Sequence, residues 1–134
     1  MTKLRQSDFA NVSFPDCTVT QSHITKTRLE CVLDGIYIEY QGFIEATVIL
    51  TISDWDEAVV EQFDANENMS IAVPIEDTGE FLDICKCDLK LNEAILAGFE
   101  KQSGLWQSIK FKSPTITIEI LDKDRRIGGN TASN

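Results

Sequence analysis

Four cysteines and one histidine are the residues of this 134-residue sequence whose side chains have the most specific chemistry. Only Cys85 and Cys87 lie close together, whereas a four-thiolate zinc site normally uses two such pairs, which Cys17 and Cys31 do not supply. The amino end does not have the pattern of an export signal, so we expect the thiols to stay reduced. We predict buried, apolar thiols, with a metal site at the cysteines as the alternative.

His23 is the only histidine, so a Ser-His-Asp or Cys-His arrangement would have to use it. It ends a run of alternating polar residues that is typical of a strand surface. The sequence has no Gly-rich phosphate loop, nucleophile elbow or zinc-protease motif. It therefore predicts a protein that is not an enzyme and uses no cofactor and no metal.

The charge of the chain is concentrated in one block. The formal net charge is −10, which argues against binding to nucleic acid or to anionic membranes. Residues 29–85 hold fourteen acidic residues and no Lys or Arg, whereas each flanking segment carries a net charge of +2. If these carboxylates share a face, they create a negative potential that attracts a cationic partner. The alternative is that the charge serves solubility alone.

Hydrophobic alternation predicts a mainly β fold, an antiparallel sheet or sandwich with one or two short helices; an α+β fold is the alternative. Residues 1–13 lack a period and are expected to form an arm or edge piece. Periodicity leaves residues 92–104 open between a helix and a hairpin. The predicted strands cover about 17–24, 29–33, 36–40, 44–52, 70–75, 81–89, 106–111 and 115–121.

Two turns are predicted from their glycines. Asp34-Gly35 is typical of a two-residue hairpin loop and would set Leu33 opposite Ile36. A three-residue loop then predicts a bulge at Gly42, with Ile36 opposite Val48.

The period changes after the strand at 44–52, and a helix is predicted from about 54 to 63. Ser53 is a suitable N-cap, and a helical turn of 100° per residue would place Trp55 and Phe63 against the sheet. The opposite side would then carry four carboxylates, those of Asp54, Glu57, Glu61 and Asp64.

The length favours one globular domain at residues 1–126, followed by a disordered tail at 127–134. No apolar stretch approaches the ~20 residues that span a bilayer, so we expect a cytoplasmic protein. The candidate partner-binding residues are the acids of the predicted helix and of the 76–80 loop, with Trp55 as a contact anchor among them. They are Asp54, Trp55, Asp56, Glu57, Glu61, Asp64, Glu76, Asp77 and Glu80.

The segment Phe14-Pro15-Asp16, followed by alternating strands and an Asp-Gly turn, resembles the small bacterial β-rich immunity-type proteins that open with a Phe-His-Asp element. The similarity covers about the first third of the chain, and Pro15 stands in place of the histidine. The resemblance implies a single-domain inhibitor that binds and neutralises a cognate toxin. Together with the acidic block, it leads us to expect a non-enzymatic protein that inhibits a basic partner such as a toxin or nuclease. The competing hypothesis is a structural subunit that self-associates through sheet edges or exposed aromatic residues.

Overall fold

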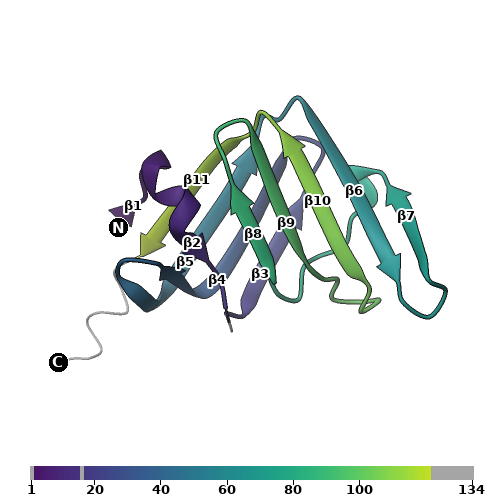
Figure 1. The fold of residues 1–134 in the computed structure, drawn as a ribbon, viewed down its shortest axis with the longest axis horizontal. Coiled ribbons are helices and arrows are strands. Elements are labelled where there is room, and N and C mark those ends of the chain that lie inside the picture. Colours follow the sequence, from purple (N-terminus) through teal and green to yellow (C-terminus); the bar gives the residue numbers. More distant parts are fainter. Residues whose placement is uncertain (1, 16, 122–134) are drawn as a thin grey trace.

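The computed structural model describes residues 2–15 and 17–121 and confirms a mainly β, antiparallel fold (Figure 1). Its only helical elements in this part are two short 3-10 helices, η1 (Gln6–Asn11) and η2 (Ile75–Asp77). The strands are β1 (Thr2–Lys3), β2 (Val12–Ser13), β3 (Val19–Ile24), β4 (Arg28–Ile38), β5 (Gly42–Ser53), β6 (Glu57–Asp64), β7 (Met69–Val73), β8 (Lys86–Leu89), β9 (Glu93–Phe99), β10 (Trp106–Lys112) and β11 (Thr115–Leu121).

The strands form two sheets that face each other across one core. Sheet A has the order β1-β11-β5-β4-β2, with β3 also paired to β4, and sheet B has the order β7-β6-β10-β9-β8. Because side chains alternate along a strand, each sheet turns one apolar row inward. The fully buried side chains include Leu33, Leu50 and Ile118 from sheet A and Leu96, Ile109 and Phe111 from sheet B.

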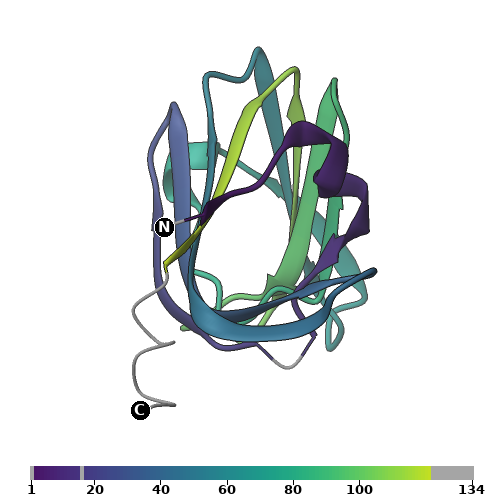
Figure 2. The same ribbon diagram turned by 90° about the vertical axis from the view of Figure 1, so that its left-hand side faces the viewer.

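The end of sheet A formed by β4 and β5 curls across the molecule, which gives the sheet the shape of a half-barrel (Figure 2). The register of β4 against β5 shifts between Leu33 and Gly35, and such a bulge bends a strand. The predicted Asp34-Gly35 hairpin is therefore wrong, because β4 runs through these residues. A Cβ at Gly35 would lie 2.6 Å from the ring of the exposed Phe43, so a larger residue there would require that ring to move. Asp34 is held by its carboxylate, which accepts the backbone N–H of Thr18 at 2.8 Å.

The chain instead reverses at residues 39–41, between Ile38 and its partner Gly42. The predicted bulge at Gly42 is wrong, because Gly42 pairs directly with Ile38 and the register shifts at Leu33/Gly35 instead; Gly42 has φ +86° at the end of the turn. The predicted register is also wrong, because Ile36 lies opposite Ile44 and Val48 lies opposite Leu33.

The helix predicted at 54–63 is a strand, β6, held between β7 and β10 in sheet B. Val60 faces the core, whereas Val59 and Phe63 lie on the outer face. The helical pattern arose because Phe63 is apolar without being in the core; on the outer face it lies opposite Trp106. Pairing with two neighbouring strands overrides such a local pattern.

The remaining predictions agree with the structure in most places. Residues 92–104 form a hairpin arm, β9, followed by a turn, and residues 2–13 supply the edge strands β1 and β2 as well as η1. Within 81–89 only Lys86–Leu89 is a strand, although Phe81 makes an isolated bridge to Glu100. The tail predicted at 127–134 lies outside the described residues.

Candidate protein-binding surface

Six of the fourteen acidic residues of the central block lie on one hairpin and the turn that follows it. We call residues Glu57–Asp77, which comprise β6, β7, their loop and η2, the acidic hairpin. It contains six acidic residues and no Lys or Arg: Glu57, Glu61, Asp64, Glu67, Glu76 and Asp77. The hairpin occupies the right-hand side of the molecule in Figure 1.

Glu57 and Glu61 project from the outer face of β6. In the register with β10, Glu57 lies opposite Lys112, whereas Glu61 lies opposite Ser108. On its other side Glu61 lies opposite Ala72 of β7. Its carboxylate is exposed and makes no ion pair within the described residues.

The loop from β6 to β7 is shaped by Asp64. Its Oδ1 accepts the backbone N–H groups of Asn66 at 3.0 Å and Glu67 at 3.3 Å, as turn-forming aspartates often do. Asn68 completes the turn with φ +51°, a conformation that asparagine tolerates. Asp64 is therefore half-buried and structural, whereas Glu67 is exposed.

Two lysines from the segments that flank the acidic block form ion pairs with Glu76 of η2 and with Glu80, which follows η2. Lys26 Nζ lies 4.0 Å from Glu76 Oε2, and Lys101 Nζ lies 4.0 Å from Glu80 Oε1. All four side chains are well exposed, so these pairs contribute little to stability. Asp77, beside Glu76, has no ion pair in the described part of the chain.

Asp54, Trp55 and Asp56 lie in the connection from β5 to β6, at the end of β6 opposite the loop of the acidic hairpin. Trp55 packs on Phe111, with ring centroids 4.7 Å apart, and is part of the core. The prediction that Trp55 is a contact anchor therefore finds no support in its packing. The structure places Glu57, Glu61, Asp64, Glu76 and Asp77 in the acidic hairpin, whereas Asp54 and Asp56 lie in the connection that leads into it.

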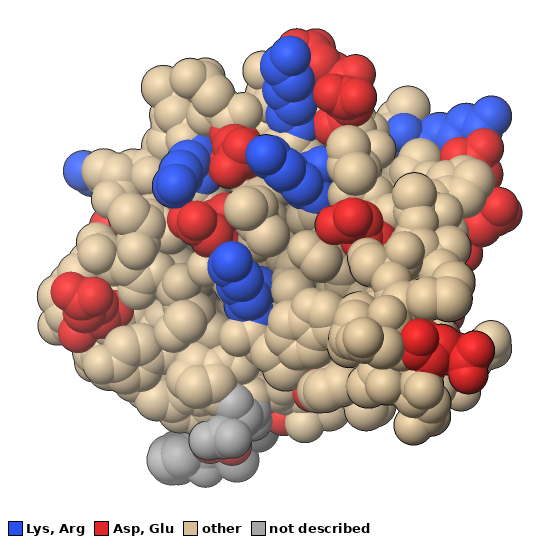
Figure 3. Space-filling model, turned by 45° about the vertical axis from the view of Figure 1, so that its right-hand side comes forward, with Lys and Arg blue, Asp and Glu red and all other residues tan. Residues whose placement is uncertain are grey.

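The charges are unevenly distributed on the side of the molecule that carries β6 and β7. In Figure 3, basic and acidic groups are interspersed over the upper part of the view, and acidic groups at the lower right stand without basic neighbours. Within the acidic block, Glu30, Glu76 and Glu80 form ion pairs with Arg28, Lys26 and Lys101. The cations therefore neutralise part of the acidic block and leave Glu61, Glu67 and Asp77 unpaired.

Two features of sheet B were not found from the sequence. The first is a row of partly exposed aromatic residues on its outer face, in which Trp106 lies between Phe63 and Phe99 and meets Phe99 edge to face at 5.3 Å. The second is the apolar edge strand β7, with exposed Met69 and Ile71. The uncharged run from Met69 to Val73 inside the acidic block is the sequence signal that could have indicated this edge.

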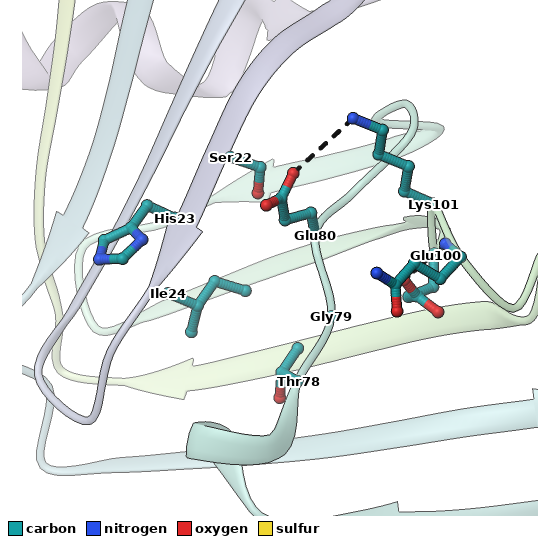
Figure 4. A pocket seen from close by; sticks show the side chains of 9 residues that line it. Ser22, His23, Ile24, Thr78, Gly79, Glu80, Glu100 and Lys101 are labelled. Atoms are coloured by element: carbon teal, nitrogen blue, oxygen red, sulfur yellow. Dashed lines mark hydrogen bonds and ion pairs between the residues drawn. The ribbon is translucent and has the colours of Figure 1, made fainter.

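A polar cavity of about 390 Å³ lies between β3 and residues 78–84, a segment that we call the strap because it crosses from η2 to β8. Ser22 and His23, neighbours on β3, point in opposite directions there (Figure 4). Ser22 is also committed to the core, because its Oγ accepts the Phe81 N–H at 3.4 Å. A nucleophile–base pair of Ser22 and His23 is therefore excluded by geometry.

Glu100 is the buried carboxylate at the same cavity. Burial alone would raise its pKa, but hydrogen bonds from Ser103 and from the backbone N–H of Gln102 outweigh this effect and lower the pKa. Oε2 accepts the Gln102 N–H and Oε1 accepts the Ser103 N–H, both at 2.8 Å. Glu100 therefore stabilises the β9–β10 turn and is not available as a general base.

The cysteines, all within the described residues, form no disulfide. Cys17 and Cys31 are buried as predicted, and Cys87 is half-buried, but Cys85 is exposed, so the prediction of four buried thiols is wrong there. Cys85 lies between the strap and β8, which begins at Lys86; its backbone N–H donates to the Ala97 oxygen of β9, but its side chain is exposed. Burial raises the pKa of the Cys31 and Cys87 thiols to about 12.

Within residues 2–15 and 17–121, no group of three or more His, Cys, Asp or Glu side chains is arranged to hold a metal ion. In the same residues no helix is long and apolar enough to cross a membrane. No family model, curated protein or solved structure matches this chain.

Proposed function

We propose that this chain is a non-enzymatic binding protein whose acidic hairpin engages the cationic surface of a basic protein partner, such as a toxin or nuclease domain, in the cytoplasm. By occupying the cationic groove of that partner it would block access of substrate. The observation that supports the proposal is that three exposed carboxylates on one hairpin form no ion pair within the described residues. They belong to Glu61, Glu67 and Asp77. Unpaired surface charge of one sign accelerates encounters with a partner of opposite sign.

Two further observations favour binding over catalysis. The polar cavity beside β3 has its serine and its buried carboxylate committed to structural hydrogen bonds. Its histidine points away from the serine (Figure 4). The resemblance of the first third of the chain to immunity-type proteins points to the same class of function, an inhibitor of a cognate toxin.

The test is to measure association with the product of a neighbouring gene that encodes a basic protein. The double variant Glu61→Lys/Glu67→Lys is compared with the control Glu39→Lys/Glu45→Lys. The control makes the same change in net charge at two exposed positions, one in the β4–β5 turn and one near the start of β5. We expect only the first variant to lower the association rate, about ten-fold at low salt, and to flatten its salt dependence. Equal effects of both variants, or no effect of either, would contradict the proposal.

The aromatic row of Phe63, Trp106 and Phe99 favours a second candidate function, a subunit that self-associates. Exposed aromatic residues on neighbouring strands are common in protein interfaces. Light scattering distinguishes the two functions, because a stable homo-oligomer that resists salt supports self-association and a monomer supports the acidic inhibitor.

A further inference from the structure

The edge strand β7 is the place in this fold where backbone groups are open to a partner. β7 pairs only with β6, and β6 continues to β10 on its other side. In an antiparallel pair, alternate residues direct their N–H and C=O groups away from the neighbouring strand. None of these outward groups in Met69–Val73 forms a backbone hydrogen bond to another described segment.

The other strand edges are shorter or covered. At the opposite end of sheet B, η1 and β2 pack against β8. In sheet A, β1 and β2 have two residues each, and β3 has an irregular register and faces the strap, which donates the Phe81 N–H to Ser22. Natural proteins protect exposed edges with charges, prolines, bulges or covering segments. β7 has none of these within its five residues, since Pro74 follows the strand.

The side chains of β7 fit the same role. Met69 and Ile71 lie on one face of the strand and are 50% and 47% exposed. Ser70 and Ala72, on the other face, are small and uncharged. A strand added alongside β7 would form main-chain hydrogen bonds and would cover Met69 and Ile71 with apolar residues spaced two apart.

The charges around β7 determine which strand can be added. Glu67 precedes β7, Glu76 and Asp77 follow it, and Glu61 lies one strand inward, opposite Ala72. A second copy paired antiparallel about Ile71 would bring its Glu76 next to Glu67, and a parallel copy would place Glu67 beside Glu67. Like charges in neighbouring strand positions destabilise pairing. A segment with basic residues at both ends meets opposite charge in either direction.

We propose that β7 is a strand-addition site for an extended segment of the basic partner, with alternating apolar residues in the middle and Lys or Arg at both ends. This inference rests on the proposed function and specifies how the partner is bound. The five residues of β7 span about 17 Å, so the basic ends of the segment must lie at least that far apart.

The probe is the capped peptide Lys-Lys-Val-Thr-Val-Thr-Val-Lys-Lys, and its control is the same peptide with alternate backbone N atoms methylated, which keeps the charge and removes main-chain donors. We expect the first peptide to bind, to protect amide protons of β7 from exchange, and to bind at least about ten-fold more tightly than the control. Equal binding of both peptides means electrostatic attraction only and would overturn strand addition.

The protein variants test the location. Ile71→Lys places a charge on the edge and should weaken peptide binding about ten-fold. Leu91→Lys adds the same charge at a 68% exposed apolar residue in the β8–β9 turn and should leave binding unchanged. Light scattering of the unbound wild type should show a monomer; a dimer that Ile71→Lys dissociates would assign β7 to a second copy and overturn the inference.

These outcomes are separable from the fate of the proposed function. If the peptide fails to bind while Glu61→Lys/Glu67→Lys still slows association with the basic partner, strand addition is wrong. The proposal that the acidic hairpin binds the basic partner is then still supported. If that double variant and its control associate equally fast, the proposed function is wrong whatever the peptide does.

Discussion

The side chain of Gln107, fully buried on β10, donates a hydrogen bond from Nε2 to the carbonyl oxygen of Gly79 at 3.1 Å. Its Oε1 accepts a hydrogen bond from Gln62 Nε2 at 3.0 Å, so both ends of the amide are satisfied. This chain of contacts links β6 and β10 to the strap. The strap closes one side of the core between the sheets, because its residue Phe81 is among the largest buried side chains.

Replacing Gln107 should therefore be costly. In Gln107→Leu the Gly79 carbonyl and the Gln62 amide lose their partners, and we expect the free energy of unfolding to fall by about 2–4 kcal/mol. The matched control is Gln102→Leu at an exposed turn position, where a change within about 0.5 kcal/mol is expected. Urea denaturation measures both variants. A Gln107→Leu protein as stable as the wild type would show that the amide is not needed to hold the strap.

A second prediction concerns Gly98 on β9, which lies directly under the strap. A Cβ there would be 2.1 Å from the backbone oxygen of Asp83. The strap cannot easily move away, because Asp83 Oδ1 accepts the Phe99 N–H at 3.0 Å and the Leu82 N–H donates to the Phe99 oxygen at 2.8 Å. Gly98→Ala should therefore destabilise the protein by more than about 2 kcal/mol.

Gly42→Ala is the comparison for this substitution. Gly42 has φ +86° but open space around its Cα, so alanine there meets backbone strain without a clash and should cost about 1 kcal/mol. Thermal unfolding ranks the two variants. The reverse order would mean that the strap yields more readily than the β4–β5 turn.

The sequence predicted the fold class and most strands because inward positions alternate faithfully in the long strands of sheet A. Leu29, Cys31 and Leu33 of β4 are all buried, as their spacing indicates. Two local signals misled the prediction, the helical spacing at 54–63 and the pair Asp34-Gly35. Asp34-Gly35 has the composition of a hairpin turn, but it lies at a bulge inside β4, where Gly35 packs beside Phe43 of the neighbouring strand.

The grouping of the candidate site residues follows only in part from the sequence. The absence of Lys and Arg between Arg28 and Lys86 marks the acidic block, and six of its fourteen acidic residues lie in the acidic hairpin, whereas the other eight lie on β4, β5, their connections and the strap. The partial pairing with Lys26 and Lys101 was not predictable, since it depends on how the β3–β4 turn meets η2 and how the β9–β10 turn meets the strap. The edge position of β7 depends on strand order, which local periodicity does not contain.

The thiols provide a third prediction. Cys85 is exposed, whereas Cys31 is buried and the pKa of Cys31 and Cys87 is raised to about 12, which leaves both protonated at neutral pH. Burial and the nearby Asp83 carboxylate also raise the pKa of Cys85, so it should react more slowly than a free thiol peptide.

Mass spectrometry after timed alkylation at pH 8 tests this order. We expect Cys85 to be modified first and Cys31 and Cys87 only after addition of denaturant. Cys85→Ser should remove the native-state reaction. Modification of Cys31 at the same rate as Cys85 would mean that the core opens on the timescale of the reaction.

The last prediction follows from the lowered pKa of Glu100. A carboxylate whose pKa is lower in the folded than in the unfolded protein adds stability above the unfolded pKa and loses it as the pH falls through the folded pKa. Glu100→Gln keeps one acceptor for the N–H groups of Gln102 and Ser103 but loses the charge, and should cost about 1–2 kcal/mol at pH 7. The difference from the wild type should shrink as the pH falls through the lowered pKa of the folded protein, because below it the wild-type carboxylate is protonated in both states. Urea unfolding at a series of pH values measures this difference in the free energy of unfolding. The control is Glu39→Gln, at an exposed side chain that forms no hydrogen bond to the described residues. Its free energy of unfolding should stay within about 0.5 kcal/mol of the wild type. A Glu100→Gln difference that does not change with pH would show that packing of the side chain, and not its charge, stabilises the turn.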